Sequence, residues 1–331
     1  MDNQVRGNKT DTLDAQHLAE THFKIERALF YQQKPVYDEL QRMSRYYDEI
    51  NEDIVRHKNR LHKALQQTFP ELETVLSNPD GKLYWHLVQD FPHPEIVHAF
   101  SGEDLIKIIK HACGRNENRT RLEKIASKLK TASDLAYPAV DVISYENKHV
   151  IFLAKEIEQL TARKDEIIDD MISKAYKLPE LAILESIPGI GKLTAVRLIG
   201  ELGDIRRFRT SNKLNAFIGL DIHQYQSGDK DLRFGISKRG NPIARKILFR
   251  AIATIATAAN YHPCHIADFY NTRKALDLKY LTEKKKQSPE SIKINTKKTT
   301  ISAMNRLIRT IHHLIITGQF YDYTVASGKR N

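Results

Sequence analysis

The sequence contains little cysteine and no long apolar run. Its two cysteines, Cys113 and Cys264, stand far apart without a CxxC pair or a Cys/His cluster, so neither a zinc site nor a disulfide framework is indicated. The N-terminal stretch MDNQVRGNKTD lacks the apolar core of a signal peptide, and no segment reaches the roughly 18 apolar residues that span a bilayer. These absences predict a soluble protein of a reducing cytoplasm, with no membrane partner.

Acidic residues are outnumbered by basic ones. The 331 residues include 52 lysines and arginines against 41 aspartates and glutamates, which gives a formal charge of +11. Such an excess favours a polyanionic partner, although a merely basic soluble protein has the same composition. With 41% hydrophobic residues, the chain has enough apolar material for one large core or two to three modest ones. We therefore expect a folded protein of several parts.

Helical periodicity dominates the sequence and predicts a mainly α fold. Apolar residues recur at three and four positions over about 10–30, 36–69, 120–136, 140–176 and 301–316. Prolines and turn residues divide 70–94 into short helices. Two long helices around a compact insert suggest an antiparallel, coiled-coil-like hairpin, although an ordinary bundle core or a dimerisation arm has the same periodicity.

A glycine turn between two short helices is the sharpest local motif. It resembles a helix-hairpin-helix, in which free amides at the second helix face a nucleic-acid phosphate, and its central residues are Gly189, Ile190, Gly191 and Lys192. A phosphate-binding P-loop is excluded, because that motif needs glycine at Ser186 and serine or threonine at Leu193. A turn that joins two helices only for packing is the alternative.

A basic, glycine-rich segment follows and contains a candidate nucleophile. Seven basic residues face only Asp229 and Asp231 between 228 and 250: Lys230, Arg233, Lys238, Arg239, Arg245, Lys246 and Arg250. This composition suits phosphate binding. Ser227 precedes Gly228 in what we interpret as a loop, where an exposed hydroxyl could attack phosphorus; Ser-Gly is otherwise an ordinary turn.

Two carboxylates near the N-terminus form a candidate metal site. Asp11 and Asp14 lie three residues apart at a predicted helix start, where both could hold one Mg²⁺ together with water and substrate phosphate. Helix capping by Asp11 and an acidic first turn explain the same two residues without a metal.

The order of these motifs resembles IS110-type transposases, the IS116/IS110/IS902 group. The resemblance rests on KTDTLDA, the long hairpin, IPGIGKLTA, FIGLDIHQYQSG and ISKRGN, in that order. It implies a RuvC-like α/β nuclease domain with an Asp-Glu-Asp-Asp metal site, joined by a coiled coil to a transposase domain with a nucleophilic serine. Asp11 and Asp14 match the last two carboxylates. Ser227 matches the serine, with Ser237 nearby as a second candidate.

The resemblance also implies boundaries and partners. We expect a remnant of the nuclease domain at 1–34, a helical region at 35–177 and a helical transposase domain at 178–331. Only ten residues precede Asp11, so the family's first aspartate and its glutamate are expected to be missing and independent catalysis is in doubt. DNA, a structured guide RNA and a homo-dimer or tetramer are the implied partners, in a bacterial or archaeal cytoplasm near the nucleoid.

Two other functions remain open from the sequence. A non-catalytic helix-hairpin-helix DNA-binding protein, or an inactive truncated transposase, would keep the glycine turn and use Ser227 only as a turn residue. An oligomerisation scaffold would use the long helices alone.

Overall fold

The computed structural model describes residues 12, 15–16, 19–20, 31–114, 117–227, 230–285 and 294–328, with the backbone alone for 285 and for the strand residues before 235. The chain divides into two units, Met1–Lys34 and Pro35–Asn331. In the first unit the described residues between 12 and 20 are helical and exposed, as the periodicity predicts. Asp11 and Asp14 lie outside the described residues.

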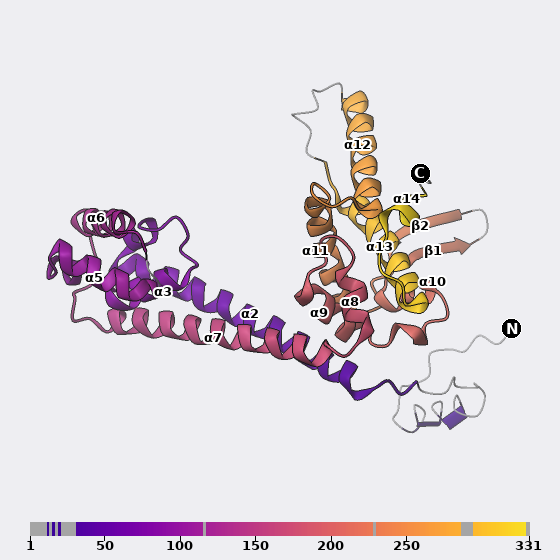
Figure 1. The fold of residues 1–331 in the computed structure, drawn as a ribbon, viewed down its shortest axis with the longest axis horizontal. Coiled ribbons are helices and arrows are strands. Elements are labelled where there is room, and N and C mark those ends of the chain that lie inside the picture. Colours follow the sequence, from indigo (N-terminus) through magenta and orange to yellow (C-terminus); the bar gives the residue numbers. More distant parts are fainter. Residues whose placement is uncertain are drawn as a thin grey trace. The chain divides into compact units, whose positions relative to one another are not determined.

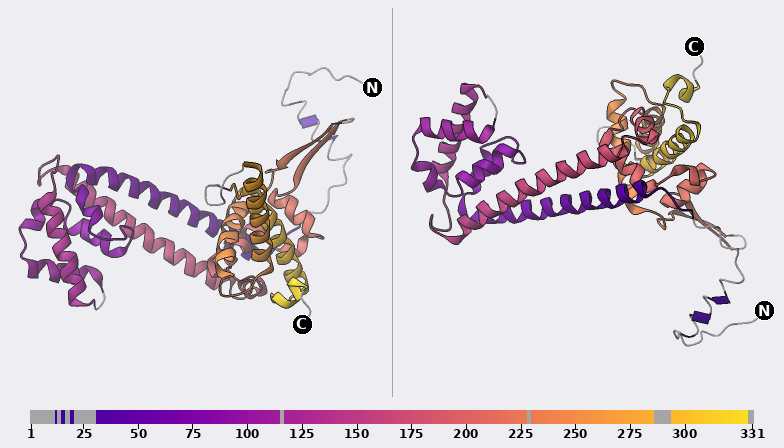
Figure 2. Two further views of the ribbon diagram at one scale, coloured as in Figure 1. Left: turned by 90° about the horizontal axis from the view of Figure 1, so that it is seen from above. Right: turned by 60° about the horizontal axis from the view of Figure 1, so that its bottom comes forward.

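Two long helices form the hairpin that the periodicity predicts. Helix α2 (Pro35–Thr68) pairs along its length with α7 (Tyr145–Ala175), as Figures 1 and 2 show. The predicted start of the second helix at 140 is wrong by five residues. The Asn147 side chain donates hydrogen bonds to the Asp141 and Val142 carbonyls, which holds the preceding segment outside the helix.

A compact helical insert joins the two arms of the hairpin. It consists of η1 (Pro70–Thr74), α3 (Lys82–Asp90), α4 (Pro94–His98), α5 (Gly102–Cys113) and α6 (Arg119–Leu135). Its core contains Phe69, Leu87, Phe91 and Leu105, all fully buried. The buried His93 caps α4 by accepting from the Glu95 amide and donates from Nε2 to the Val140 carbonyl at 3.0 Å. The proline and glycine signals therefore mark real helix boundaries.

The C-terminal part of the second unit is also helical, with one two-stranded ribbon. Its helices are α8 (Pro179–Glu185), α9 (Lys192–Leu202), η2 (Ile205–Arg207), α10 (Ser211–Ile218), α11 (Pro242–Ala258), α12 (His265–Lys285), α13 (Lys297–Thr317) and α14 (Tyr323–Ser327). The strands are β1 (Ile222–Ser227) and β2 (Lys230–Ile236), which pair antiparallel and form the one sheet among the described residues. The mainly α fold class is confirmed.

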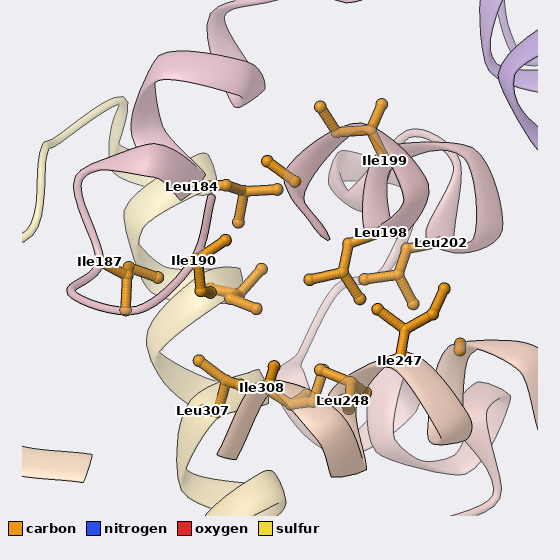
Figure 3. Close-up of a cluster of buried hydrophobic side chains, with 14 of the residues drawn as sticks. Leu184, Ile187, Ile190, Leu198, Ile199, Leu202, Ile247, Leu248, Leu307 and Ile308 are labelled. Carbon is orange, nitrogen blue, oxygen red and sulfur yellow. The ribbon is translucent and has the colours of Figure 1, made fainter. Parts of the chain in front are cut away.

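A second apolar core holds these C-terminal helices together. Leu184, Ile190, Leu198, Leu248 and Leu307, contributed by α8, the following turn, α9, α11 and α13, are buried together, as Figure 3 shows. The Cys264 side chain is buried in the same core. No helix among the described residues is both long and apolar enough to cross a membrane.

The first half of α2 belongs to this second core. Tyr37 and Leu40 of α2 are buried there, and Gly200 of α9 lies against the α2 backbone. A Cβ at Gly200 would come within 2.7 Å of the Leu40 carbonyl carbon, so only glycine allows this close crossing. The hairpin is therefore joined to the C-terminal helices by direct backbone packing.

Replacing Gly200 by alanine should lower the free energy of unfolding by about 2 kcal/mol, because the two helices must separate to admit the methyl group. The loss should appear although alanine favours a helix over glycine by about 1 kcal/mol. Urea denaturation followed by circular dichroism measures it. Gly102→Ala at the first turn of α5, where a Cβ meets open space, is the control and should change stability little. A Gly200→Ala variant as stable as the parent would contradict the close crossing.

Candidate nucleic-acid site

The predicted serine loop is a β-ribbon, and the ribbon places the two candidate serines at opposite ends. Ser227 ends β1 and pairs with Lys230, whereas Ile222 pairs with Ile236 at the other end. Ser237 follows Ile236 directly. The prediction of a loop was wrong because the strand signal is weak: LRFGI in the second strand alternates apolar and other residues, but the apolar residues of IHQYQS stand three positions apart. The side chains of Ser227, Lys230 and Arg233 lie outside the described part.

At the base of the ribbon, Ser237 is bonded to a carboxylate that the sequence analysis did not single out. Its hydroxyl donates to Asp221 Oδ1 at 2.6 Å, and its amide donates to the Asp221 carbonyl at 2.8 Å. Asp221 precedes β1, so the pair closes the ribbon where it leaves the helices. Asp221 is the lone acid in the FIGLDIHQYQSG run, which was the available signal.

Two glycines pack the segment after the ribbon directly against α10. A Cβ at Gly240 would lie 2.1 Å from the Phe217 carbonyl oxygen, and one at Gly219 would lie 2.6 Å from the Gly240 nitrogen. Gly219 also ends α10 with a φ of 77°. The GL and KRGN motifs therefore contact each other through the backbones of Gly219 and Gly240.

The predicted DNA-binding residues of this segment divide into two groups. Lys238 and Arg239 are exposed, and Lys238 has a positive φ of 58°, which is unusual for a residue with a side chain. Arg245 instead donates to the Ile218 carbonyl at 2.6 Å and the Lys238 carbonyl at 3.2 Å. Arg245 thus supports the turn, while its two neighbours in the KRGN motif face solvent.

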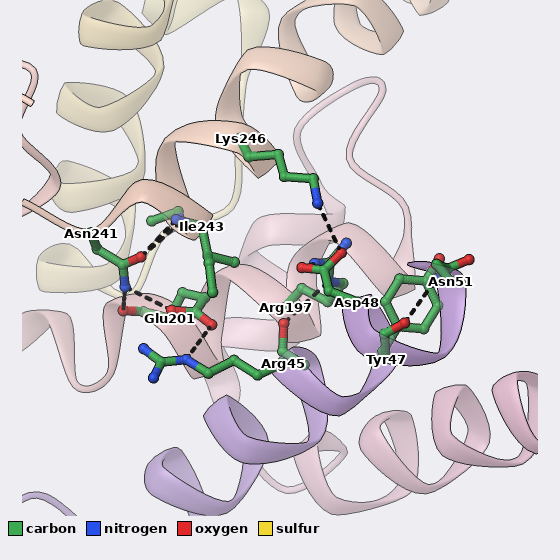
Figure 4. Close-up of polar contacts among 11 residues, drawn as sticks. Arg45, Tyr47, Asp48, Asn51, Arg197, Glu201, Asn241, Ile243 and Lys246 are labelled. Carbon is green, nitrogen blue, oxygen red and sulfur yellow. Dashed lines mark hydrogen bonds and ion pairs between the residues drawn. The ribbon is translucent and has the colours of Figure 1, made fainter. Parts of the chain in front are cut away.

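A buried carboxylate fixes the start of α11 to α9. Asn241 caps α11 by accepting from the Ile243 and Ala244 amides, and its side-chain nitrogen donates to Glu201 Oε2 at 2.7 Å. Glu201 is 1% exposed and also pairs with Arg45 of α2, as Figure 4 shows. The KRGN segment is thereby tied to the helical hairpin.

A second ion-pair network lies beside it. The buried Arg197 donates to Ser44 and Asp48 of α2, and its guanidinium lies 4.7 Å from the Tyr47 ring centroid. Lys246 of α11 pairs with the same Asp48 carboxylate at 3.3 Å (Figure 4). The sequence named Lys246 only as part of a basic, phosphate-binding segment, and the other residues of this network were missed because the partners lie about 150 to 200 positions apart. The charged Arg197 within an apolar helix was a local signal.

The glycine turn joins α8 and α9 as the motif predicts, but its two glycines have different surroundings. Gly189 has a φ of 88°, and a Cβ there would lie 2.5 Å from Ile255 Cα of α11. Ile190 is buried in the core. Gly191 and Lys192 are exposed at the start of α9, and a Cβ at Gly191 meets open space. Packing alone therefore requires Gly189, whereas phosphate binding at Gly191 and Lys192 stays a prediction.

Comparison with known proteins identifies this C-terminal part. The family profile described as Transposase IS116/IS110/IS902 family matches residues 181–270, from α8 into α12, and a DEDD-type transposase profile matches residues 1–70. Residues 181–270 are therefore similar to the transposase domain of the IS116/IS110/IS902 family, and residues 1–70 are similar to a DEDD-type transposase domain. The first match contains the glycine turn, the ribbon and the KRGN segment, so the shared part coincides with the features described above.

Individual relatives are transposases as well. The chain is 37% identical over 118 residues to a transposase for insertion sequence element IS1111A of Coxiella burnetii, with 36% of this chain and 30% of the relative aligned. It is 29% identical over 133 residues to a transposase for insertion sequence element IS1328 of Yersinia enterocolitica, with 40% of this chain and 37% of the relative aligned. The chain thus spans about a third of the length of the relatives that it matches.

The expected metal site falls outside the described residues. In the part of the chain that the structure describes, no three His, Cys, Asp or Glu side chains gather as metal ligands. Asp11 and Asp14 stand outside that part, so their role as metal ligands stays a prediction.

Substitutions at the two glycines of the turn separate packing from phosphate binding. Gly189→Ala should lower the free energy of unfolding by about 3 kcal/mol, since it combines a positive φ with overlap on the α11 backbone. Gly191→Leu should keep a free energy of unfolding within about 1 kcal/mol of the parent, because a side chain there meets open space. It should bind unrelated DNA sequences roughly tenfold more weakly, because the side chain would cover the exposed amides proposed to contact phosphate.

The matched control for the binding measurement is Gly81→Leu. Gly81 also precedes a helix in an extended conformation with open space around it, but it lies in the insert. DNA affinity at fixed salt is measured by fluorescence anisotropy. Equal affinity of the Gly191→Leu and Gly81→Leu variants would show that the turn has only a packing role.

Proposed function

We propose that this chain cleaves and rejoins DNA strands of an insertion sequence through a serine nucleophile. The observation that carries the proposal is the family match over 181–270, which contains Ser227, the β-ribbon and the basic KRGN segment. Exposed Lys238 and Arg239 at the ribbon base suit a phosphate backbone. DNA is accordingly the proposed substrate.

The proposed step is a displacement at phosphorus. The serine Oγ forms a bond to the phosphorus of a DNA phosphodiester, the bond from phosphorus to a sugar oxygen breaks, and that oxygen takes a proton. The Oγ proton must pass to a base, because a serine hydroxyl is a poor nucleophile at neutral pH. Rejoining reverses these bonds on another strand and frees the serine.

Ser227 is the first candidate for this role, and the group that activates its hydroxyl must come from outside the ribbon base. By register it lies at the opposite end of the ribbon from the Asp221 carboxylate. A divalent metal, proposed as Mg²⁺ held by Asp11 and Asp14, would lower the pKa of a bound hydroxyl and stabilise charge on the phosphate. The DEDD-type match over residues 1–70 supports a divalent-metal requirement.

Ser237 is the second candidate, and one contact favours it. Its hydroxyl already donates to the Asp221 carboxylate at 2.6 Å, which is the arrangement of a nucleophile and its general base. The same bond also serves as a simple closure of the ribbon base. A direct test must therefore compare the two serines.

Further partners belong to the same proposal. A structured guide RNA would choose the DNA sites, and dimers or tetramers, paired through the coiled-coil-like hairpin, would bring two active sites together. Helix-hairpin-helix binding of DNA without catalysis is the remaining alternative.

Ser227→Ala should abolish the covalent protein–DNA adduct that a serine mechanism forms, while DNA affinity stays within about twofold, because one hydroxyl contributes little to a phosphate-dominated interface. Denaturing gel electrophoresis of reactions with labelled insertion-sequence ends detects the adduct. Ser237→Ala is the matched control and should retain it. An adduct lost only in Ser237→Ala would assign the nucleophile to the ribbon base, and an adduct kept in both variants would exclude these two serines as nucleophiles.

Removal of divalent metal by EDTA should also abolish the adduct, and Mg²⁺ should restore it. Asp11→Asn combined with Asp14→Asn should reproduce the loss at saturating DNA. Asp38→Asn combined with Glu49→Gln on α2 is a control with the same change of charge. Undiminished adduct in the Asp11/Asp14 variant would contradict the proposed metal ligands.

A further inference from the structure

A basic groove follows the exposed side of α13, well outside the residues assigned above. Three adjoining hollows form it, with volumes of about 840, 300 and 390 Å³. The first two share Arg306 and Arg309, and the last two share Ser302, so each hollow adjoins the next. We call this the α13 groove and define it by Phe269, Arg273, Lys298, Arg306, Arg309 and Tyr321.

The cations of the α13 groove have no acidic partners within it. Arg273 and Arg306 both lie over the ring of Phe269, with guanidinium carbons 5.9 and 4.6 Å from its centroid. Among the described residues, no carboxylate forms an ion pair with either arginine, with Arg309 or with Lys298. Like charges gathered on one aromatic ring repel each other, so the groove gains stability when an anion lies between them.

The acids that line the groove accept hydrogen bonds from neighbouring hydroxyl and amide groups. Asp322 accepts from the Thr324 amide and hydroxyl at the start of α14, and this bonding holds its pKa below the usual range. Asp277, at the far end, accepts from the Thr299 hydroxyl at 2.7 Å. The two carboxylates reduce the positive charge of the groove at its two ends, while its centre is lined by Arg306 and Arg309.

The largest hollow has an aromatic wall next to these arginines. The Tyr321 and His265 rings stack with an interplanar angle of 13°. The Tyr321 hydroxyl oxygen accepts from the His265 amide, so its own proton is free for His265 Nδ1 at 2.8 Å. Burial, assisted by the charge of Arg306, lowers the pKa of His265, which keeps the ring neutral. Phe320 is 62% exposed at the same hollow and offers an unoccupied ring face.

We propose that the α13 groove binds single-stranded nucleic acid, with its arginines on the phosphates and the exposed Phe320 ring on a base. Cations without acidic partners beside an exposed aromatic ring suit such a strand, because phosphates and unstacked bases alternate along it. From Lys298 to His313 the helix rises about 22 Å, which accommodates several nucleotides. A duplex buries its bases and cannot use the ring.

The inference rests on the proposed function only in taking nucleic acid as the ligand. Binding to the groove requires no catalytic serine. Serine chemistry and groove binding can therefore fail independently, and each has its own measurement.

The test uses fluorescence anisotropy with a labelled oligothymidylate, its oligouridylate counterpart and a DNA duplex of equal length. The variant Arg306→Gln with Arg309→Gln should bind both single strands about tenfold more weakly, and the slope of log affinity against log salt should fall in magnitude by about 1.4, the value for two lost phosphate contacts. A stronger effect on one single strand identifies whether DNA or RNA occupies the groove.

Lys110→Gln with Lys124→Gln on the insert is the matched control, because it removes the same charge from exposed helix positions outside the groove. It should leave single-strand affinity within about twofold. Phe320→Leu keeps the apolar character but removes the ring, and it should weaken single strands roughly fivefold while sparing the duplex.

Three results would overturn the proposal. Unchanged single-strand affinity in the arginine variant would show that the groove does not hold the strand. Equal losses in the arginine and lysine variants would reduce the effect to net charge. A loss for the duplex as large as that for the single strands would contradict strand selectivity. Circular dichroism melting of each variant establishes that it is folded before binding is compared.

Discussion

The close crossing of α2 and α9 is the constraint on which the second unit depends. Gly200 brings the two backbones into contact at Leu40, and both buried ion-pair networks form only because the helices lie this near. Arg197 and Glu201 occupy α9 within one turn of Gly200, and their ion-pair partners on α2, Asp48 and Arg45, lie eight and five residues after Leu40. Buried charges of this kind are costly unless they are paired, so the crossing and the networks require each other.

The same networks connect the hairpin to the KRGN segment. Glu201 holds Asn241, Asn241 begins α11, and the preceding Gly240 packs on α10 beneath the ribbon. A rigid chain of contacts thus runs from the long hairpin to the base of β1 and β2. The residues that the sequence suggests for phosphate binding, Lys238 and Arg239, lie at the end of that chain of contacts.

The sequence predicted what depends on local periodicity and missed what depends on distant partners. The spacing of apolar residues located α2, α6, α7 and α13, since each buries one stripe. The start of α7 was misplaced because Asn147 bonds to carbonyls of the segment before it. Arg245 was assigned to DNA by composition, yet its partners are carbonyls that only the folded backbone brings near. The ribbon was missed because only its second strand alternates apolar and other residues, and the pairing of the first strand is interrupted by a register shift between Ile222 and Gln224.

At the candidate site, too, local features were evident in the sequence and contacts between distant residues were not. The family resemblance and the glycine turn were both evident in the residues, whereas the Ser237 to Asp221 contact and the arginines over Phe269 appear only in three dimensions. Arg306 and Arg309 were hidden within a helix whose apolar stripe was its most visible feature. Asp11 and Asp14 remain a prediction from pattern.

The position of Ser227 depends on the angle at which the ribbon leaves its base. A strand of six residues carries its end about 17 Å from its start, so a tilt of ten degrees at the base displaces the tip by roughly 3 Å. Misplacement by about 1 Å can slow a reaction a hundredfold. The tight packing of Gly219 on Gly240, far from the serine, therefore sets how accurately anything at the tip is aimed.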